Sequence, residues 1–412
     1  MDRRYMRYVV IAVLACQQYL AIAFIYAAVP VILRANGASL QIVGLFSTVF
    51  FAFAVNFLWA PVVDRWSLNR LGLRRSWILS TQAASAAVIA AMAILNPAVD
   101  FVAVLVVCLV LATLAATQRI ATLGYVAEAL DDGERPFGAA LLGWGGAVGN
   151  AIGGAICLQL IELIGWRPAL FGFAALLLAF AGWVFTIPEP ARRKDETHPR
   201  RSVSILAIIR NDSLWTTAAM IAPGVLGVAV AFAMVQPRLV DLGFGAADIG
   251  WIGAVANILT FTMIAPLTST IVVRVAPHRA VIWACMFLAI GFAALAFLER
   301  YVGTGFAAVA SVGTVFAALA VQHVTFTNWF LELARPGETA TDVTFLTSVM
   351  SAVALVGFAA SGFVAARFGY GVTLILPGVG YALSALFAAA FARSRQMAVA
   401  PGNERLAIER TQ

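Results

Sequence analysis

The sequence predicts an all-α membrane protein in which twelve transmembrane helices form two pseudo-symmetric six-helix bundles. Three observations predict this class. Hydrophobic residues make up 62% of the 412 residues and charged residues only 11%, whereas a soluble domain carries about 25% charged residues. Long apolar runs recur along the whole chain, and the second half repeats motifs of the first. A chain this apolar needs lipid around much of its surface.

Twelve apolar runs meet the requirement of about 20 mostly apolar residues for a spanning helix. The first six predicted spans are 8–33, 41–63, 76–96, 99–127, 137–161 and 168–187. The other six are 214–237, 247–273, 280–298, 302–331, 341–366 and 371–392. The first run is too long for the hydrophobic region of a signal peptide, and no small-residue cleavage site follows it closely, so we expect it to be a span.

The Lys and Arg residues predict the orientation of these spans. With the N-terminus in the cytoplasm, the inner segments hold 21 of the 27 basic residues and the outer loops hold five. Inner loops of membrane proteins are enriched in Lys and Arg, so both termini are expected to be cytoplasmic. The predicted domains are an N-terminal bundle (1–187), a cytoplasmic linker (188–213), a C-terminal bundle (214–396) and a cytoplasmic tail (397–412).

An internal duplication relates the two halves at an offset of 204 to 206 residues. Residues 118–128 read QRIATLGYVAE and residues 322–332 read QHVTFTNWFLE, so that Arg119 corresponds to His323. Chance could produce one such match, but several matches at nearly one offset indicate duplicated six-helix units. The other matches pair Gly44 with Gly250, Ala60-Pro61 with Ala265-Pro266, Gly153 with Gly357, and Gly165-Trp166 with Gly369-Tyr370.

Composition and motifs exclude several classes of function. The basic residues lie in short loops and not on one face, which argues against a nucleic-acid partner. The four cysteines lie in apolar runs without CxxC spacing, so neither a metal site nor a disulfide framework is indicated. No Walker, HExxH or GxSxG signature occurs in a proper context. We therefore expect no enzyme activity and no cofactor, and a transporter driven by an ion gradient or by the gradient of its substrate.

Two stretches carry a family resemblance. Residues 57–82 read FLWAPVVDRWSLNRLGLRRSWILSTQ, and residues 117–128 read TQRIATLGYVAE. They resemble the AmpG-type branch of the major facilitator superfamily, which has FLW-(A/S)-P-x-x-D-R, G-x-R-R-x-W and T-Q-D-I-A-x-D-x-Y-x-x-E at these places. Within that branch the chain looks most like the RhtX/FptX siderophore permeases. Arg119 and Leu123 stand where the branch has two acidic residues.

The resemblance implies a monomeric secondary transporter of the bacterial inner membrane. It would import a ferric siderophore of the pyochelin or rhizobactin type by alternating access, as a symporter linked to the proton-motive force. Two alternatives stay open. One is an AmpG-type muropeptide permease, and the other is a membrane receptor or enzyme without transport. The third reading would need an appended soluble domain, for which the predicted loops are too short.

Arg119 is the first candidate for substrate binding, because it is the only charged residue between Phe101 and Ala127. A charge at that depth is costly and should face a water-filled cavity or a partner. It could contact an anionic substrate group through its guanidinium fork, or it could form a structural ion pair. His323 could change charge near physiological pH and couple protons, or it could simply hydrogen-bond a neighbouring helix.

The other candidates are polar or aromatic residues of the spans and the motif residues that resemble a gate. Uncharged polar residues in spans also pair between helices, and Trp near span ends often anchors at the interface. With His323, the remaining substrate-binding candidates are Gln18, Tyr19, Asn56, Tyr125, Trp144, Gln236, Asn257, Asn328 and Trp329. With His323, the coupling and gating candidates are Asp64, Arg65, Arg74, Arg75 and Glu128. Ser269 stands at the equivalent of Asp64, so the gate is expected to be asymmetric.

Overall fold

The computed structural model describes residues 3–130, 135–189, 212–333 and 339–399, and every regular element in these ranges is a helix. Ten of the helices are long and apolar enough to cross a membrane. The all-helical fold class predicted from the sequence is therefore confirmed. Most of the predicted linker (188–213) and of the predicted tail (397–412) lies outside the described residues.

The first half forms six helical columns. The first column is α1 (Arg3–Ala23), η1 (Phe24–Ala28) and α2 (Val29–Ala35). The second is α3 (Leu40–Phe46), η2 (Ser47–Phe50), α4 (Phe51–Val55), η3 (Asn56–Leu58) and α5 (Ala60–Arg65). The others are α6 (Leu73–Met92), α7 (Phe101–Ala129), the series α8 (Arg135–Asn150), η5 (Ala151–Ile156) and α9 (Cys157–Ile164), and finally α10 (Trp166–Val184).

The second half forms six more columns within the described residues. They are α12 (Asp212–Asp241), the series α13 (Ala246–Leu259), η6 (Thr260–Ile264) and α14 (Ala265–Val272), then α15 (Pro277–Val302), α16 (Thr304–Leu333), α17 (Thr339–Phe368) and α18 (Tyr370–Val399). Each of the twelve predicted spans overlaps one column. The second and third columns are not among the ten apolar helices, because the second is broken into short pieces and α6 begins with Arg74 and Arg75.

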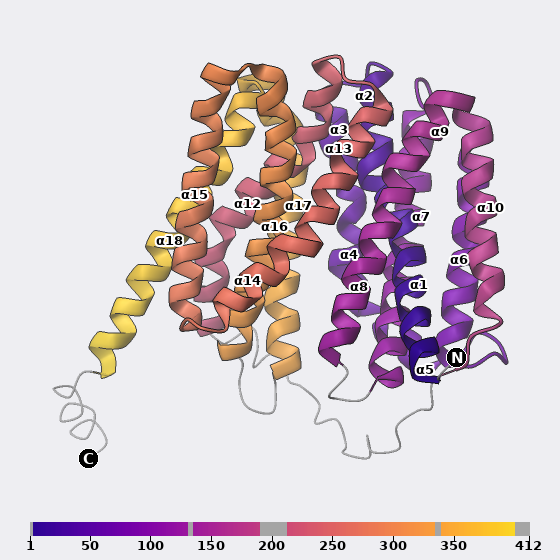
Figure 1. Ribbon diagram of the computed structural model, residues 1–412, viewed down its shortest axis with the longest axis horizontal. Helices are drawn as coiled ribbons and strands as arrows, with labels where there is room; N and C mark the ends of the chain where they lie inside the picture. Colours follow the sequence, from indigo (N-terminus) through magenta and orange to yellow (C-terminus); the bar gives the residue numbers. More distant parts are fainter. Residues whose placement is uncertain (1–2, 131–134, 190–211, 334–338, 400–412) are drawn as a thin grey trace.

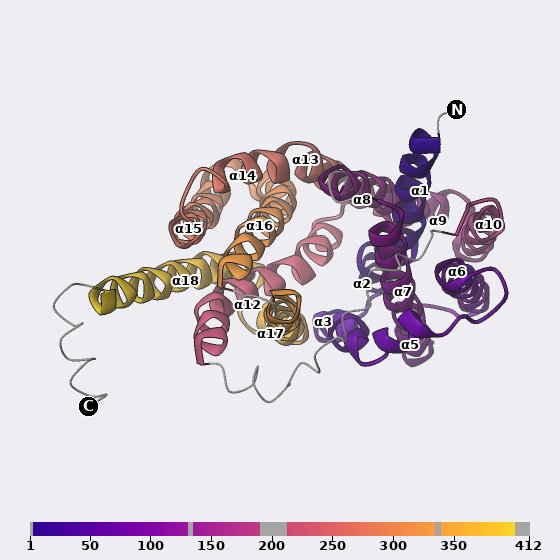
Figure 2. The ribbon, with the colours of Figure 1, turned by 90° about the horizontal axis from the view of Figure 1, so that it is seen from below.

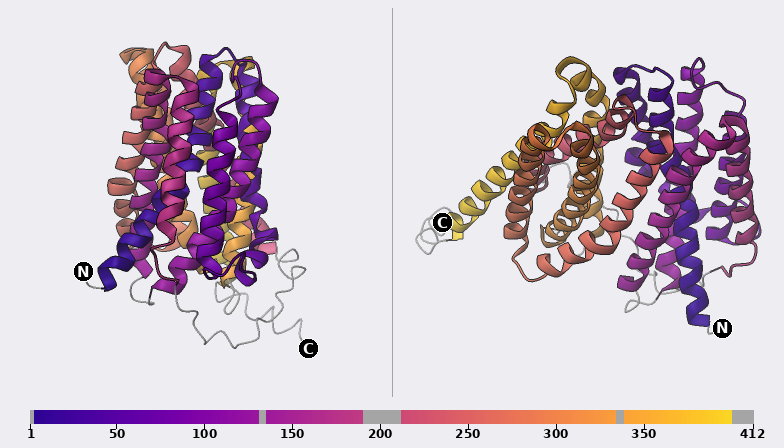
Figure 3. Two further views of the ribbon diagram at one scale, coloured as in Figure 1. Left: turned by 90° about the vertical axis from the view of Figure 1, so that its right-hand side faces the viewer. Right: turned by 45° about the horizontal axis from the view of Figure 1, so that its top comes forward.

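The two halves form separate helix groups that lean together at one end. In Figure 1 the first half is indigo to magenta and the second half runs from rose through orange to yellow. Both described chain ends lie at the lower side, which we call the termini end; the opposite side, with the α2–α3 turn, is the far end (Figures 1 and 3). The groups converge at the far end and diverge toward the termini end. Seen from the termini end, α3 lies beside α17 and α13 beside α8 (Figure 2).

Three prolines account for irregular segments in these columns. Proline has no N–H, so the carbonyl four residues earlier loses its helical partner. For Pro30, Pro61 and Pro266 that carbonyl lies in η1, η3 and η6. Such breaks are tolerated in membranes when neighbouring groups satisfy the backbone. The columns that bend in this way are the first, the second and the eighth, which consists of α13, η6 and α14. All three line the contact between the two halves.

A glycine seam joins the first and fifth columns. A Cβ atom placed on Gly145, Gly149 or Gly153 would lie 2.2 Å from a backbone oxygen of the first column. The oxygens are those of Ala12, Cys16 and Leu20. The four-residue spacing on both helices lets the two backbones touch along three turns, which is how helices associate in lipid.

The duplicated glycines have duplicated roles. Gly357 approaches the Leu226 oxygen, with a built Cβ at 2.8 Å, in the helix pair equivalent to that of Gly153. Gly165 and Gly369 have φ values of +88° and +78°, and each occupies a one-residue turn between two helices. Side chains disfavour such positive φ angles. The sequence repeat therefore preserves backbone geometry that only glycine adopts readily.

Backbone contacts between the halves close the far end at two related crossings. At the α3–α17 crossing, a Cβ on Gly44 would lie 2.6 Å from the Gly362 nitrogen, and a Cβ on Gly362 would lie 1.9 Å from the Leu40 oxygen. At the α13–η5 crossing, a Cβ on Gly250 would lie 2.7 Å from the Ala155 Cα. Gly44 and Gly250 are partners in the duplication, so the closure is pseudo-symmetric.

An ion pair between the halves covers this closed end. The Arg34 guanidinium donates to both carboxylate oxygens of Asp241 at 2.6 and 2.7 Å, and the Tyr370 hydroxyl donates to the same carboxylate at 2.6 Å. We call these three residues the far-end lock. A bidentate Arg–carboxylate pair fixes orientation as well as distance. The lock therefore ties the end of the first column to the end of the seventh.

A second polar link lies between α9 and the start of α13. The Glu162 carboxylate accepts from the Ala247 N–H at 2.9 Å, and the Trp251 indole N–H donates to Gln159 Oε1 at 3.2 Å. A carboxylate at a helix N-terminus also interacts favourably with the helix dipole. The far end is thus held by contacts from both sides of the pseudo-symmetry axis.

The glycine seam predicts a steep sensitivity to one methyl group. We expect Gly149→Ala to destabilise the protein by about 1–3 kcal/mol, because the new Cβ overlaps the Cys16 oxygen. Gly172→Ala is the matched control, since a Cβ there meets no atom within 4 Å. Thermal unfolding of the purified protein in detergent measures both, and an equal Tm for the two variants would contradict the seam.

The far-end lock predicts a shift in accessibility. Arg34→Ala should destabilise the closed far end by on the order of 1 kcal/mol, because the ion pair is partly exposed. Alkylation of Ser47→Cys by an impermeant thiol reagent added from the far side should then be several times faster. The native cysteines are buried and give a low background. The exchange of charges, Arg34→Asp with Asp241→Arg, should slow the reaction again; a rate unaffected by Arg34→Ala would contradict the lock.

Candidate substrate site between the two helix groups

A cavity of about 280 Å³ lies between the two halves, below the closed far end. We call it the central cavity. From the first half it is lined by Gln18, Tyr19, Ile22, Tyr26, Phe50, Phe53 and Arg119. From the second half it is lined by Phe232, Ser351, Ala354, Leu355 and Phe358. Most of this lining is aromatic or aliphatic, with a few polar groups, as is usual for sites that bind organic molecules.

Among the described residues of this lining Arg119 is the only charged one, and the period of α7 places it there. Its neighbours Gln118 and Thr122 are buried in the first half, whereas Arg119 and Leu123 are exposed on another face of the helix. Within the described residues Arg119 forms no ion pair or hydrogen bond. A guanidinium that has no protein partner and faces a cavity is available to an anionic ligand.

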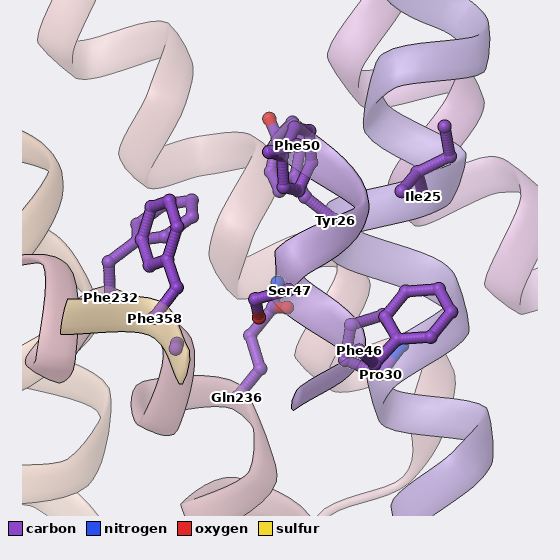
Figure 4. Close-up of a pocket in the computed structure, with 10 residues that line it drawn as sticks. Ile25, Tyr26, Pro30, Phe46, Ser47, Phe50, Phe232, Gln236 and Phe358 are labelled. Atoms are coloured by element: carbon purple, nitrogen blue, oxygen red, sulfur yellow. The ribbon is translucent and has the colours of Figure 1, made fainter. Parts of the chain in front are cut away.

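Four aromatic side chains close the cavity toward the far end. Tyr26 and Phe50 come from the first half, and Phe232 and Phe358 come from the second (Figure 4). Ring centroids are 5.7 Å apart for Tyr26 and Phe232, 6.3 Å for Phe50 and Phe358, and 6.0 Å for Phe232 and Phe358. We call these residues the aromatic plate. Because its rings come from both halves, relative motion of the halves would open it.

Two much smaller cavities, of about 10 Å³ each, lie against the aromatic plate. Both are lined by Tyr26 and Gln236. The first also contacts Ser47, whose side chain points toward Gln236 (Figure 4). The second contains the pair formed by Asn150 and Asn257, in which Asn150 Nδ2 donates to Asn257 Oδ1 at 3.2 Å across the halves. Predicted candidates Gln236 and Asn257 thus line these small cavities and not the central cavity.

His323 lies on α16 in the second half, is exposed, and does not line the central cavity. Arg119 and His323 are partners in the duplication, but of the two only Arg119 lines the central cavity.

The other predicted binding residues lie away from these cavities. The Tyr125 hydroxyl donates to the Pro188 carbonyl at 2.9 Å, and Trp329 is buried in the core of the second half. Trp144 is exposed, whereas Asn56 and Asn328 are partly buried. Of the predicted binding set, Gln18, Tyr19 and Arg119 are the three that the fold brings together in the central cavity.

The predicted gating residues meet at the termini end of the first half. Arg74 donates to Asp64 and to Glu128, each at 2.7 Å, and so joins the second, third and fourth columns. A Cβ on Gly124 would lie 2.3 Å from the Arg74 Cζ, so the guanidinium rests on that glycine. All four residues belong to the first half. The network therefore ties three columns into one body and does not bridge the halves.

The neighbouring arginines differ from Arg74. The Arg75 guanidinium donates to the carbonyls of Val184 and Phe185 at the end of α10, at 3.2 and 2.8 Å. Glu189 accepts from the backbone N–H groups of Arg74 and Arg75 at 2.7 and 3.1 Å and caps the start of α6. Arg65 is exposed. Arg75 thus fastens α6 to α10, while Arg65 has no contact of this kind among the described residues.

The sequence reasoning missed the far-end lock and the aromatic plate. A signal for the lock was present, because Gly37 and Gly243 share a φ of +86° at an offset that matches the duplication. Arg34 and Asp241 flank these two equivalent turns. The plate had no such signal, since Phe is frequent throughout the spans.

Comparison with known proteins identifies the family. The profile described as Major Facilitator Superfamily matches residues 11–354. The anhydromuropeptide permease of Escherichia coli K12 is 29% identical over 229 residues, which are 53% of this chain and 46% of that protein. The putative transporter AmpG 4 of Rickettsia felis is 22% identical over 251 residues, 58% of this chain and 61% of that protein. The chain thus aligns with about half the length of these curated relatives.

Solved structures share the whole fold. A bacterial homologue of the human lysosomal transporter Spinster, inward-facing and unoccupied, has a TM-score of 0.74 at 13% identity, covering 95% of this chain and 99% of that one. A nucleoside transporter has a TM-score of 0.72 at 14% identity, covering 94% and 99%. The family and these folds point to a transporter rather than an enzyme. The profile match over most of its length shows that this multi-pass membrane protein belongs to the Major Facilitator Superfamily.

Proposed function

We propose that the chain is a secondary transporter that carries an organic anion across a bacterial inner membrane by alternating access. Arg119 carries this proposal, as the one charged side chain of a cavity shared by both halves. An anionic group of the substrate would pair with the guanidinium, and ring or alkyl parts would pack on Tyr19, Phe53 and the aromatic plate. Charge-assisted pairing of this kind is strong where little water competes.

The arrangement of the halves supports an inward-facing state. If the termini are cytoplasmic, as the distribution of Lys and Arg predicts, the closed far end faces the periplasm. Release of the far-end lock and of the two glycine crossings would then open the other side of the central cavity. Import from periplasm to cytoplasm follows from the resemblance to permeases that work in this direction. The predicted gating role of the Arg74 network fits this scheme, because it keeps the first half rigid while it moves.

The first candidate substrate is an anhydromuropeptide. The support is the relative in Escherichia coli, which carries that name and matches about half of this chain. Such a molecule has carboxylates that Arg119 could bind, and sugar rings whose apolar faces could pack on aromatic side chains.

A ferric siderophore is the second candidate, and the chemistry of the central cavity favours it. Arg119 and Leu123 replace the two acids of the AmpG-type pattern, and the lining is rich in aromatic rings. A flat aryl chelate with phenolate or carboxylate groups suits a cation beside an aromatic plate, through ion pairing and ring stacking.

We also propose that His323 couples substrate to proton uptake. In the empty site the positive charge of Arg119 acts on the imidazole. An anion bound to Arg119 would offset that charge and so favour the protonated imidazole. The proton would then enter with the substrate, as symport requires.

Binding measurements test the substrate class. We expect Arg119→Ala to weaken binding of the true substrate about 10- to 100-fold, because a charged hydrogen-bonded partner is lost, and Arg119→Lys to retain part of the affinity. Titration of purified protein with an anhydro-N-acetylmuramyl tripeptide and with ferric pyochelin distinguishes the two candidates. Arg70→Ala, in an exposed loop, is the matched control. Equal affinity of wild type and Arg119→Ala for either bound ligand would remove Arg119 from the site.

The pH profile of uptake tests His323. We expect initial rates of wild-type uptake to rise as the external pH falls from 8 to 6, because this range covers the ordinary titration of histidine. His323→Gln should flatten that profile while leaving ligand binding at pH 8 unchanged. A variant with the wild-type pH profile would exclude His323 as the coupling group.

A further inference from the structure

The two small cavities beside the aromatic plate hold polar groups that the proposed function leaves unused. We propose that Ser47, Asn150, Gln236 and Asn257 form an outer subsite, which binds the uncharged amide or hydroxyl groups of the same substrate as it reaches the plate. This inference rests on the proposed function, since it concerns the route to the Arg119 site.

Ser47 and Gln236 lie on the entry side of the aromatic plate, whereas the Asn150–Asn257 pair lies beside it, because Asn257 is four residues from Gly253, the neighbour of Gln236, toward the termini end. Gln236 lies four residues beyond Phe232 on α12, toward the far end, and Ser47 lies three residues before Phe50. Four residues of helix correspond to about 6 Å. The aromatic plate therefore separates Ser47 and Gln236 from the central cavity by roughly one helical turn.

The polar groups are buried in a way that is costly in a closed protein. Asn150, Gln236 and Asn257 are 7%, 7% and 6% exposed. Asn150 Oδ1 has no hydrogen-bond partner although it lines the second small cavity. A buried polar atom without a partner destabilises the state in which it occurs. The volume of about 10 Å³ is close to what one water molecule needs, so the subsite is collapsed in this state.

Each polar pair is divided between the two halves. Ser47 lies on η2 and faces Gln236 on α12 (Figure 4), and Asn150 on α8 donates to Asn257 on α13. Separation of the halves at the far end would pull both pairs apart. Four neutral polar side chains would then line the route to the aromatic plate. Each could exchange its present protein partner for a donor or acceptor group of the entering substrate.

The chemistry of the subsite selects a different part of the substrate from that bound by Arg119. Among the described residues that line the two small cavities none is charged. Amide and hydroxyl side chains pair well with neutral donors and acceptors, whereas a carboxylate prefers a cation. The outer subsite would therefore bind the peptide or hydroxyl portion, while the anionic portion continues to Arg119.

Transport from each side of the membrane tests the proposal. The variant is Gln236→Leu, and the control is Gln322→Leu, which removes a buried amide that bonds Tyr381 and lines none of the three cavities. We expect Gln236→Leu to raise the KM for uptake into right-side-out vesicles about 5-fold, as expected for one lost hydrogen bond. The KM in inside-out vesicles and the maximal rates should stay within 2-fold of wild type. The probes are the labelled anhydro-N-acetylmuramyl tripeptide and ferric pyochelin.

Three results would overturn the subsite. One is an unchanged KM from the far side, and another is an equal rise in KM from both sides. The third is a change confined to the maximal rate, which would mean that Gln236 only stabilises the closed far end. Loss of binding in Arg119→Ala together with an unchanged KM in Gln236→Leu would leave the proposed function standing and refute the subsite alone. Absence of uptake of both probes by the wild type would refute both.

Discussion

Close contact between the backbones of the two halves at the far end is the constraint on which the rest of the structure depends. Gly44 meets Gly362 and Gly250 meets Ala155 with no room for another carbon atom. Because lipid gives helices no hydrophobic reason to associate, packing at small residues must hold them together. The same contacts seal one side of the central cavity and force the groups apart at the other. Packing closes the far end, and the far-end lock then fixes how the two halves are oriented there.

The central cavity concentrates one charge in an apolar setting. A lone guanidinium among aromatic rings is costly without a ligand, and this cost is the physical reason for expecting an anion there. The aromatic plate has the opposite character, because its rings gain from mutual contact in the closed state. A transporter needs both kinds of group. The guanidinium lacks a partner in the empty site and so favours binding of an anion. The aromatic plate stabilises the closed state but can separate, since its four rings come from both halves.

Much of the fold could be predicted from the sequence, because its determinants are local or repeated. Apolar runs marked all twelve columns, and the duplicated glycines marked the turns at Gly165 and Gly369 as well as the approach of Gly357 to α12. The candidate site was only partly accessible. Arg119 stood out through its charge, and the Arg74 network through a family motif. The aromatic plate could not be recognised, since phenylalanines that face lipid and phenylalanines that face a substrate have the same pattern until the helices are packed. Tyr125 is the opposite case. It was predicted to bind substrate because it is polar and lies in a span, but its hydroxyl donates to the Pro188 carbonyl.

The duplication explains why substrate binding and closure can be divided between different residues. Where the halves agree, as at Gly44 and Gly250, they form equivalent contacts that two rigid bodies need in order to rock about a common axis. Where they differ, each half contributes something the other lacks. In the duplication, His323 stands at the position equivalent to Arg119, and Ser269 stands at the position equivalent to Asp64. A symmetric scaffold can alternate between two states of similar energy, but only asymmetric side chains can make those states respond to a charged substrate. The mismatches at Arg119 and Asp64 are therefore where we propose that a duplicated scaffold acquires direction and specificity.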